Sequence, residues 1–336
     1  LGDSTTANFG SIDFAGANVS IKEGSAMELA ASEATGTLTL ESSGAVTDSG
    51  TLAITGATSI TATGQDVSLT SPDSTFGDFT VNAKDVYIVE TGSFTSTNIT
   101  AEKVEISATD GVSLVSTGDG LEFAAQSGTG NIEVVNTGGL VISELSNLQG
   151  IQFTDVDATG KISLVAKSPL TVNAPIDAKG GEVLLVASGA EAADDVTIND
   201  NVTGATVYVY AGDSIAVQGE ATINSSSFEL NVGTNYDVTT ASTSAGSASA
   251  GLSISSTAGL DKIKFPNVIL ITGKGRITEF YTNGIKIMDD YFNALNPILE
   301  ETVNLDEMGI SGTVENEIYN LVDPDNSGSI EIEKKK

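Results

Sequence analysis

Short apolar pairs separated by a single residue recur along the chain from about residue 8 to residue 232. An apolar residue at every second position is typical of a β-strand that buries one of its faces. Glycine, asparagine, aspartate or serine lies close to most pairs, which indicates strands of about four or five residues that end in tight turns. The clearest pairs are Val19/Ile21, Leu38/Leu40, Val67/Leu69, Val86/Ile88, Val104/Ile106, Ile132/Val134, Ile151/Phe153 and Leu170/Val172.

The spacing of these pairs indicates a repeat. The first members lie 19 residues apart from Val19 to Leu38, and steps of 19 and 18 residues lead from Val67 through Val86 to Val104. Similar steps continue from Ile132 to Ile151 and Leu170, and then through the pairs Ile162/Leu164, Val183/Leu185, Val207/Val209 and Phe228/Leu230. Turns at such short intervals also suit a β-sandwich, but a regular period of about 19–21 residues favours stacked coils.

We therefore predict an all-β fold, a right-handed parallel β-helix over residues 1–240. Each coil would place its strands in parallel register on those of the next coil, so that the apolar pairs stack in the interior. Composition agrees, because valine, isoleucine and threonine dominate the strands and only Pro72, Pro169 and Pro175 precede residue 260. With one coil per strand spacing of ~4.8 Å, about 11 or 12 coils would form a rod roughly 55 Å long.

Several stretches of these repeats resemble known secreted proteins. Residues 8–14 (NFGSIDF), 16–21 (GANVSI), 29–32 (LAAS), 35–40 (TGTLTL) and 44–52 (GAVTDSGTL) look like repeats of filamentous haemagglutinin-like and autotransporter-like secreted proteins. The resemblance covers about residues 8–235. It implies a β-helix displayed outside a bacterial cell, where such repeats serve as stalk material.

The regular spacing of apolar pairs ends at about residue 240. Residues 241–260 are rich in serine, alanine and glycine, and we predict a linker or a loose coil there. Residues 261–336 are predicted to form a small α+β element, with a buried strand at 266–271, mixed helical spacing over 284–305 and a short helix at 315–322. This element would either cap the open end of the β-helix or form an interface to a neighbouring subunit or a following domain.

An acidic loop near the C-terminus resembles the opening of an EF-hand or dockerin-type calcium loop. Its glycine, Gly328, stands at the sixth position, where the loop turns sharply. Lys334 occupies the twelfth position, where a bidentate glutamate belongs, so a solvated acidic turn is the competing interpretation. The predicted Ca²⁺ ligands at positions one, three, five, seven and nine are Asp323, Asp325, Ser327, Ser329 and Glu331.

Charge and composition exclude several classes of function. The chain has 45 acidic and 14 basic residues, a net charge of -31, and neither histidine nor cysteine. Triads that use histidine or cysteine, thiolate or imidazole metal sites and disulfides are therefore excluded. The acidic excess argues against nucleic acid and anionic membranes as partners. No apolar run is long enough to form a transmembrane segment, and the absence of an initiator methionine suggests a processed chain or an excised fragment.

The sequence also bears on functions more specific than that of a structural rod. Pairs of carboxylates, at Asp194/Asp195, Asp289/Asp290 and Glu300/Glu301, are compatible with a polysaccharide hydrolase on a β-helix scaffold. A lyase is disfavoured because the only arginine, Arg276, lies outside the repeats. An ice-binding array of threonines is also disfavoured, since Thr37/Thr39 and Thr61/Thr63 do not recur at the coil period.

The sequence therefore favours a non-enzymatic, extracellular structural or adhesive rod of a bacterial cell surface. An adhesin stalk and a subunit of a filament or surface layer are the two forms that we expect. Partners would be further copies joined head to tail, or molecules of the cell surface or extracellular matrix. The first 260 residues hold 31 acidic against 6 basic residues, so the repeats would carry an acidic surface that keeps the protein soluble.

Overall fold

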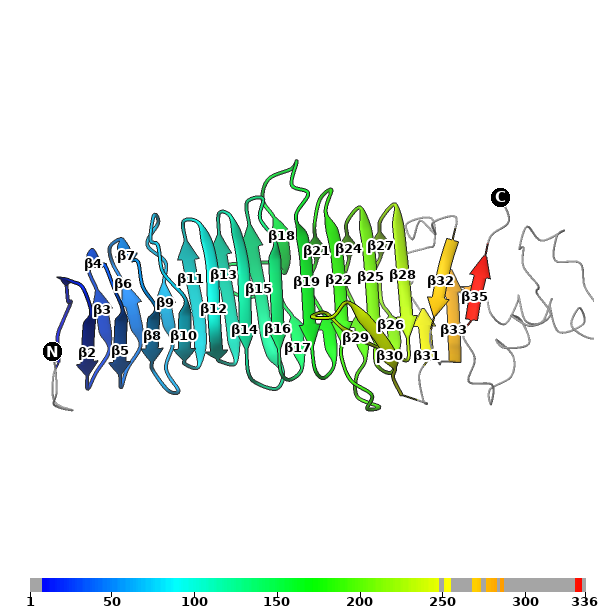
Figure 1. Ribbon diagram of the computed structural model, residues 1–336, viewed down its shortest axis with the longest axis horizontal. Helices are drawn as coiled ribbons and strands as arrows, with labels where there is room; N and C mark the ends of the chain where they lie inside the picture. The colour runs from blue at the N-terminus through cyan, green and yellow to red at the C-terminus, as the bar shows by residue number, and fades with distance from the viewer. Residues whose placement is uncertain are drawn as a thin grey trace, which may run out of the picture. The chain divides into compact units, whose positions relative to one another are not determined.

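A computed structural model describes residues 8–247 and the short segments 251–254, 268–272, 276–282, 285–286 and 330–333. All elements in these residues are β-strands, and the described part contains no helix. The chain divides into two compact units, Leu1–Ser163 and Leu164–Lys336. Parallel stacking of short strands, visible within each unit in Figure 1, confirms the predicted right-handed parallel β-solenoid, with about 11 turns. None of the described segments is a helix long and apolar enough to cross a membrane.

The first unit stacks its strands into three parallel sheets. The first sheet contains β2 (Val19–Glu23), β5 (Leu38–Ser42), β8 (Thr58–Thr61), β10 (Phe79–Asn82), β12 (Ser93–Thr100), β14 (Gly111–Ser116) and β16 (Ile132–Asn136). The second sheet contains β3 (Met27–Leu29), β6 (Val46–Asp48), β9 (Val67–Leu69), β11 (Asp85–Glu90), β13 (Lys103–Ala108), β15 (Leu121–Ser127), β17 (Leu140–Ile142) and β18 (Ile151–Phe153). The third contains β1 (Ala15–Gly16), β4 (Ser32–Ala34) and β7 (Leu52–Ile54), and β19 (Lys161–Ala166) runs across the boundary between the units.

The second unit repeats this arrangement with three further rows of paired strands. One row contains β20 (Leu170–Val172), β23 (Val196–Ile198), β26 (Ile215–Val217), β31 (Gly251–Ile254) and β33 (Arg276–Thr282). Another contains β21 (Ile176–Asp177), β24 (Val202–Thr203) and β27 (Ile223–Asn224). The third contains β22 (Glu182–Ala187), β25 (Thr206–Ala211), β28 (Ser227–Val232) and β32 (Val268–Thr272). Antiparallel pairs join β29 (Thr234–Asp237) to β30 (Ser242–Ala245), β33 to β34 (Ile285–Lys286), and β32 to β35 (Ile330–Glu333).

Columns of aliphatic side chains form the core, as the period predicted. In the first sheet, one buried column runs through Ile21, Leu40, Ile60, Val81 and Ile99, each in register with the next. Because the side chains of a strand alternate between its two faces, the residues between these positions point away from the core. This column of the core is therefore apolar and continuous from strand to strand.

The predicted steps are confirmed in three stretches and wrong in a fourth. Val19 pairs in register with Leu38. Val67, Val86 and Val104 pair in register, and so do Val183, Val207 and Phe228. The step from Ile132 to Ile151 is not a step between stacked strands, because the two residues lie in different sheets. Ile132 pairs with Val112 in the first sheet, whereas Ile151 pairs with Ala125 in the second.

Phenylalanine side chains pack against one another in the first unit. The rings of Phe79 on β10 and Phe94 on β12 are stacked, with centroids 5.3 Å apart and an angle of 28° between their planes. The ring of Phe76 is tilted by 60° to that of Phe79, with the two centroids 4.8 Å apart. Phe79 and Phe94 are both fully buried. In register with Phe79, the neighbouring coils have the smaller buried residues Thr58 and Ser96.

The C-terminal predictions fall mostly outside the described residues. Within the stretch 241–260, where a linker or loose coil was expected, the described segments include β30 and β31. β32 overlaps the strand predicted at 266–271. The helix predicted at 315–322 lies outside the described residues, and of the stretch 284–305 only β34 is described, as a strand.

Candidate functional site

Of the predicted calcium ligands, the structure describes only Glu331. Glu331 lies in β35, where it pairs with Leu270 of β32. The other predicted ligands, Asp323, Asp325, Ser327 and Ser329, lie outside the described residues. Across the residues that the structure describes, no group of three or more histidine, cysteine, aspartate or glutamate side chains is arranged to hold a metal ion. Calcium binding therefore stays a prediction.

A polar hollow lies among the turns of the second unit. It has a volume of about 720 Å³ and opens beside the turn that follows β23 and the segment between β26 and β27. β24 and β27 contribute one residue each to its wall. No aromatic or basic side chain lines it, so neither stacking on a sugar ring nor attraction of an anion is available there. Its lining residues are Asn199, Asp200, Asn201, Thr203, Glu220, Thr222 and Asn224.

Amide side chains at this hollow connect one coil to the next. The Asn199 Nδ2 donates a hydrogen bond to the Asn173 Oδ1 of the preceding coil, at 2.8 Å. The Asn201 Oδ1 accepts from both the backbone N–H and the hydroxyl of Thr222 in the following coil, at 3.2 and 2.6 Å. Three of the amide and hydroxyl side chains that form the hollow thus hold the turns of the solenoid together.

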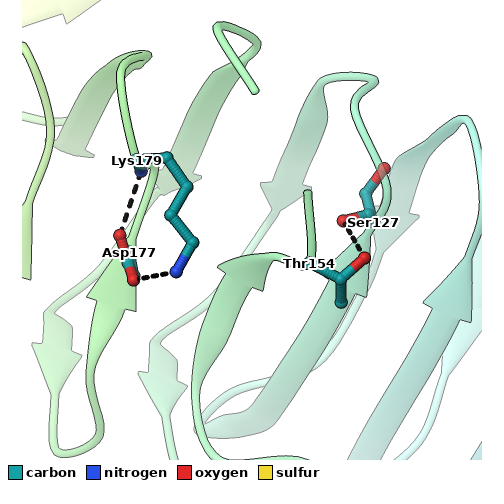
Figure 2. A network of polar contacts seen from close by, with 4 residues as sticks. All are labelled: Ser127, Thr154, Asp177 and Lys179. Atoms are coloured by element: carbon teal, nitrogen blue, oxygen red, sulfur yellow. Dashed lines mark hydrogen bonds and ion pairs between the residues drawn. The ribbon is translucent and has the colours of Figure 1, made fainter. Parts of the chain in front are cut away.

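A neighbouring lysine is paired locally. Figure 2 shows Lys179, whose backbone N–H donates to the Asp177 Oδ1 at 3.0 Å and whose ammonium group forms an ion pair with the same carboxylate. Asp177 is in register with Thr203, which is in register with Asn224 in the wall of the hollow. Figure 2 also shows, within the first unit, the Thr154 hydroxyl donating to the Ser127 carbonyl at 3.3 Å. Both contacts support turns.

The acidic pair Asp194/Asp195 accepts backbone hydrogen bonds. The Asp194 Oδ2 accepts from the N–H of Glu191 at 2.7 Å, and the Asp195 Oδ1 accepts from the N–H of Ser214 at 2.9 Å. Burial raises the pKa of both carboxyl groups, and the charge of Asp213 raises the pKa further. Asp194 is only 3% exposed, so it is closed to a polymeric substrate. The other predicted pairs, Asp289/Asp290 and Glu300/Glu301, lie outside the described residues.

Glu90 is a buried carboxyl group that the sequence interpretation missed. It is 5% exposed, at the end of β11, where its Oε1 accepts a hydrogen bond from the Phe76 N–H at 3.1 Å. Its other oxygen, Oε2, is buried without a hydrogen-bond partner. Burial raises the pKa of Glu90 to about 7. The signal was present in the sequence, because Glu90 continues the alternation of Val86 and Ile88 and so had to point inward.

Because its pKa is raised in the folded protein, Glu90 is expected to make the protein less stable as the pH rises. An unfolded chain releases this proton near pH 4.5, whereas the folded chain holds it up to about pH 7. The stabilisation is therefore complete below pH 4.5, falls between pH 4.5 and 7, and is lost above pH 7. Glu90→Gln cannot ionise. The unfolding free energy of this variant minus that of the wild type should therefore increase by roughly 1–3 kcal/mol as the pH rises from 5 to 8.

Chemical denaturation of both proteins at pH 5, 6, 7 and 8 would measure this change. A difference between wild type and Glu90→Gln that stays constant across the series would contradict the assignment of a neutral, buried Glu90. Comparing the two proteins at each pH cancels the titration of all other groups, because the remaining carboxyl groups are common to both.

Comparison with known proteins gives one partial match. Residues 16–83 match a family described as repeats of unknown function (DUF5649). No curated protein and no solved structure matches the chain. The matched segment begins within β1 and ends just after β10, so it lies entirely within the stacked coils of the first unit. The match agrees with the repetitive character of the sequence and assigns no activity to it.

Proposed function

We propose that the chain is a non-enzymatic structural or adhesive segment displayed outside a bacterial cell, as an adhesin stalk or as a subunit of a filament or surface layer. The observation that carries the proposal is the use of polar side chains between successive coils. These side chains hydrogen-bond along the stack, and three of the side chains that line the hollow of the second unit are used in the same way. Resemblance of the repeats to secreted haemagglutinin-like proteins supports the extracellular setting.

Contacts between coils recur in several parts of the stack. In the first unit, Lys22 forms an ion pair with Glu41, and the Lys103 Nζ lies 3.2 Å from the Glu122 Oε2. Side-chain hydrogen bonds add the pairs Gln126–Ser107 at 2.8 Å and Ser116–Asn136 at 3.1 Å, and the hollow of the second unit contributes Asn199–Asn173. Exposed ion pairs are individually worth less than about 1 kcal/mol, so such contacts matter through repetition.

The acidic surface limits the ways in which copies of the chain can associate. With a net charge of -31, neighbouring copies repel one another unless a specific contact brings them together. Head-to-tail association of solenoid ends is the contact that the proposal favours, because stacked strands leave unpaired backbone groups at their ends. Lateral sheet-to-sheet pairing is disfavoured by the same charge.

Two measurements on the intact protein test the proposal. We expect antibodies against the chain to label unpermeabilised cells of the source organism. We also expect no new reducing ends when the full chain is incubated with neutral and uronate polysaccharides. Labelling that appears only after permeabilisation would contradict the extracellular assignment. Release of reducing ends that disappears in Asp200→Asn or Glu220→Gln, both in the wall of the hollow, would favour the hydrolase instead.

A further inference from the structure

Four consecutive strands of the first sheet contain no charged residue. These strands, β8, β10, β12 and β14, have the sequences TSIT, FTVN, SFTSTNIT and GVSLVS and lie side by side in Figure 1. Charged side chains return at the outward positions on either side, with Glu41 on β5 and Glu133 on β16. Part of the first sheet is therefore without charge, in a chain with 45 acidic residues. The strands β17, β20, β23 and β26 also lack charged residues, but their outward side chains are half-buried, whereas most of those on β8, β10 and β12 are exposed.

The uncharged face includes Ser93 and Thr95 of β12 and Ser113 and Val115 of β14. We give the name neutral face to six of its polar outward side chains, two on each of β8, β10 and β12. It consists of Ser59, Thr61, Thr80, Asn82, Thr97 and Thr100. All of them except the half-buried Ser59 are exposed. Ser59 is in register with Thr80, and Thr61, Asn82 and Thr100 form a second row. Neighbouring strands lie ~4.8 Å apart, and a register shift after Phe79 places Thr97 beside Thr80.

The hydroxyl groups of the neutral face are held in place. The Thr80 and Thr97 hydroxyl oxygens are 2.9 Å apart, and the Thr100 hydroxyl lies 2.9 Å from that of Thr117, just beyond β14. Thr97 also donates to the backbone carbonyl of Phe79 at 3.3 Å. Threonine is β-branched and has few rotamers, so little conformational entropy remains to be lost when a ligand binds. The array is therefore preorganised.

We propose that the neutral face binds an extended, uncharged polysaccharide. This inference rests on the proposed adhesive function and names the partner of that function. Hydroxyl and amide groups both donate and accept, as the hydroxyl groups of a sugar do. An anionic polymer would be repelled by the acidic surface around the face, and a cationic polymer would prefer that surface to the face itself. Only an uncharged polymer is neither repelled by the acidic surface nor drawn away from the neutral face by it.

The ligand must be long because each contact is weak. One hydrogen bond exchanged with water contributes about 1 kcal/mol, or about fivefold in affinity. A monosaccharide or disaccharide that reaches two or three of these groups is therefore held weakly, whereas a polymer that follows a row gains many contacts at once. Binding without ion pairs also predicts that added salt leaves the affinity unchanged.

Native affinity electrophoresis of the full chain tests the proposal. Gels would contain hydroxyethyl cellulose, mixed-linkage β-glucan, mannan or dextran, and carboxymethyl cellulose provides an anionic polymer with the same backbone as the first. We expect at least one neutral polymer to retard the protein and carboxymethyl cellulose to leave its migration unchanged. Salt at about 0.5 M, which shortens the screening length to between ~3 and 10 Å, should not change the retardation. Retardation by none of the four neutral polymers, or by the anionic one alone, would overturn the proposal.

A pair of isosteric variants locates the binding. Thr80→Val/Thr97→Val removes both hydroxyl groups of one hydrogen-bonded pair and keeps the branched shape, so the fold should be retained. We expect the dissociation constant to rise at least about fivefold, the equivalent of one lost hydrogen bond. The control is Thr171→Val/Thr197→Val, two half-buried threonines in register on β20 and β23 of the second unit, and it should bind as the wild type does because these side chains are less accessible than those of the neutral face. Equal affinity of both double variants would overturn the proposal.

Two other occupants of the face are distinguished by the same variants. If Thr80→Val/Thr97→Val abolishes thermal hysteresis in freezing solutions while no polysaccharide binds, the face recognises ice. If the variant abolishes a concentration-dependent dimer in sedimentation experiments while no polysaccharide binds, the occupant is a second copy of the chain. Either result would replace the polysaccharide. Antibody labelling of intact cells is independent of these outcomes, so failure of this inference and failure of the extracellular function can be told apart.

Discussion

Replacing Phe94 by alanine is expected to lower the free energy of unfolding by about 3–5 kcal/mol. Phe94 is fully buried and stacks on Phe79, with ring centroids 5.3 Å apart. Truncation would remove apolar area from the core and leave a void, and the stacked coils on either side restrict how far the chain can close it. It would also remove the ring–ring contact, which contributes about 0.5–1.5 kcal/mol beyond the buried area.

Guanidinium denaturation followed by circular dichroism would measure this loss, with two control variants. Phe94→Leu keeps most of the apolar volume and should cost clearly less than Phe94→Ala. Thr95→Ala changes the adjacent outward-facing residue and should stay within about 0.5 kcal/mol of the wild type, as exposed substitutions do. If Phe94→Ala were as stable as Thr95→Ala, the buried, stacked position of Phe94 would be wrong.

The fold could be predicted because the spacing of the apolar pairs along the sequence equals the length of one coil. Val67, Val86 and Val104 are 19 and 18 residues apart, and they stack in register in the second sheet. Each coil contributes one such residue to a column, so a constant spacing along the chain becomes a constant position in space. The 24-residue step from Val183 to Val207 shows that a longer turn is tolerated without loss of register.

The assignment of pairs to sheets could not be predicted with the same success. Ile132 and Ile151 are 19 residues apart, as stacked residues are, but they belong to different sheets. Every sheet of the solenoid buries the same kind of apolar pair, so the pattern carries no mark of the sheet to which a strand belongs. β15 makes this concrete, because it pairs with both β17 and β18.

The candidate sites were harder to predict than the fold. Threonine pairs alone did not show the neutral face, because Ser59 and Asn82 take the place of threonine in its rows. A register shift between Phe79 and Thr80 also brings Thr97, rather than a residue at the expected spacing, beside Thr80. Glu90, in contrast, was predictable from its inward position, and a search for charged residues at apolar positions would have found it.

Replacing Gly130 by alanine is expected to destabilise the protein by at least about 3 kcal/mol, the upper end of the usual cost of overpacking. Gly130 lies between β15 and β16, where its backbone passes close to the turn of an adjacent coil. A Cβ atom added there would lie 1.3 Å from the carbonyl oxygen of Asp110 and 2.9 Å from the backbone nitrogen of Gly111. The obstructing atoms belong to the backbone, so no change of rotamer relieves the overlap and the two coils must separate.

Thermal denaturation of Gly130→Ala beside Gly10→Ala would measure this effect. Gly10 is the matched control, because a Cβ atom there would meet nothing within 4 Å. Gly10→Ala should therefore stay close to the wild type, while Gly130→Ala melts at a clearly lower temperature. Equal melting temperatures for the two variants would mean that the coils do not approach each other at Gly130. The test thus separates close stacking of the backbone from the general cost of losing a glycine, since both variants make the same chemical change.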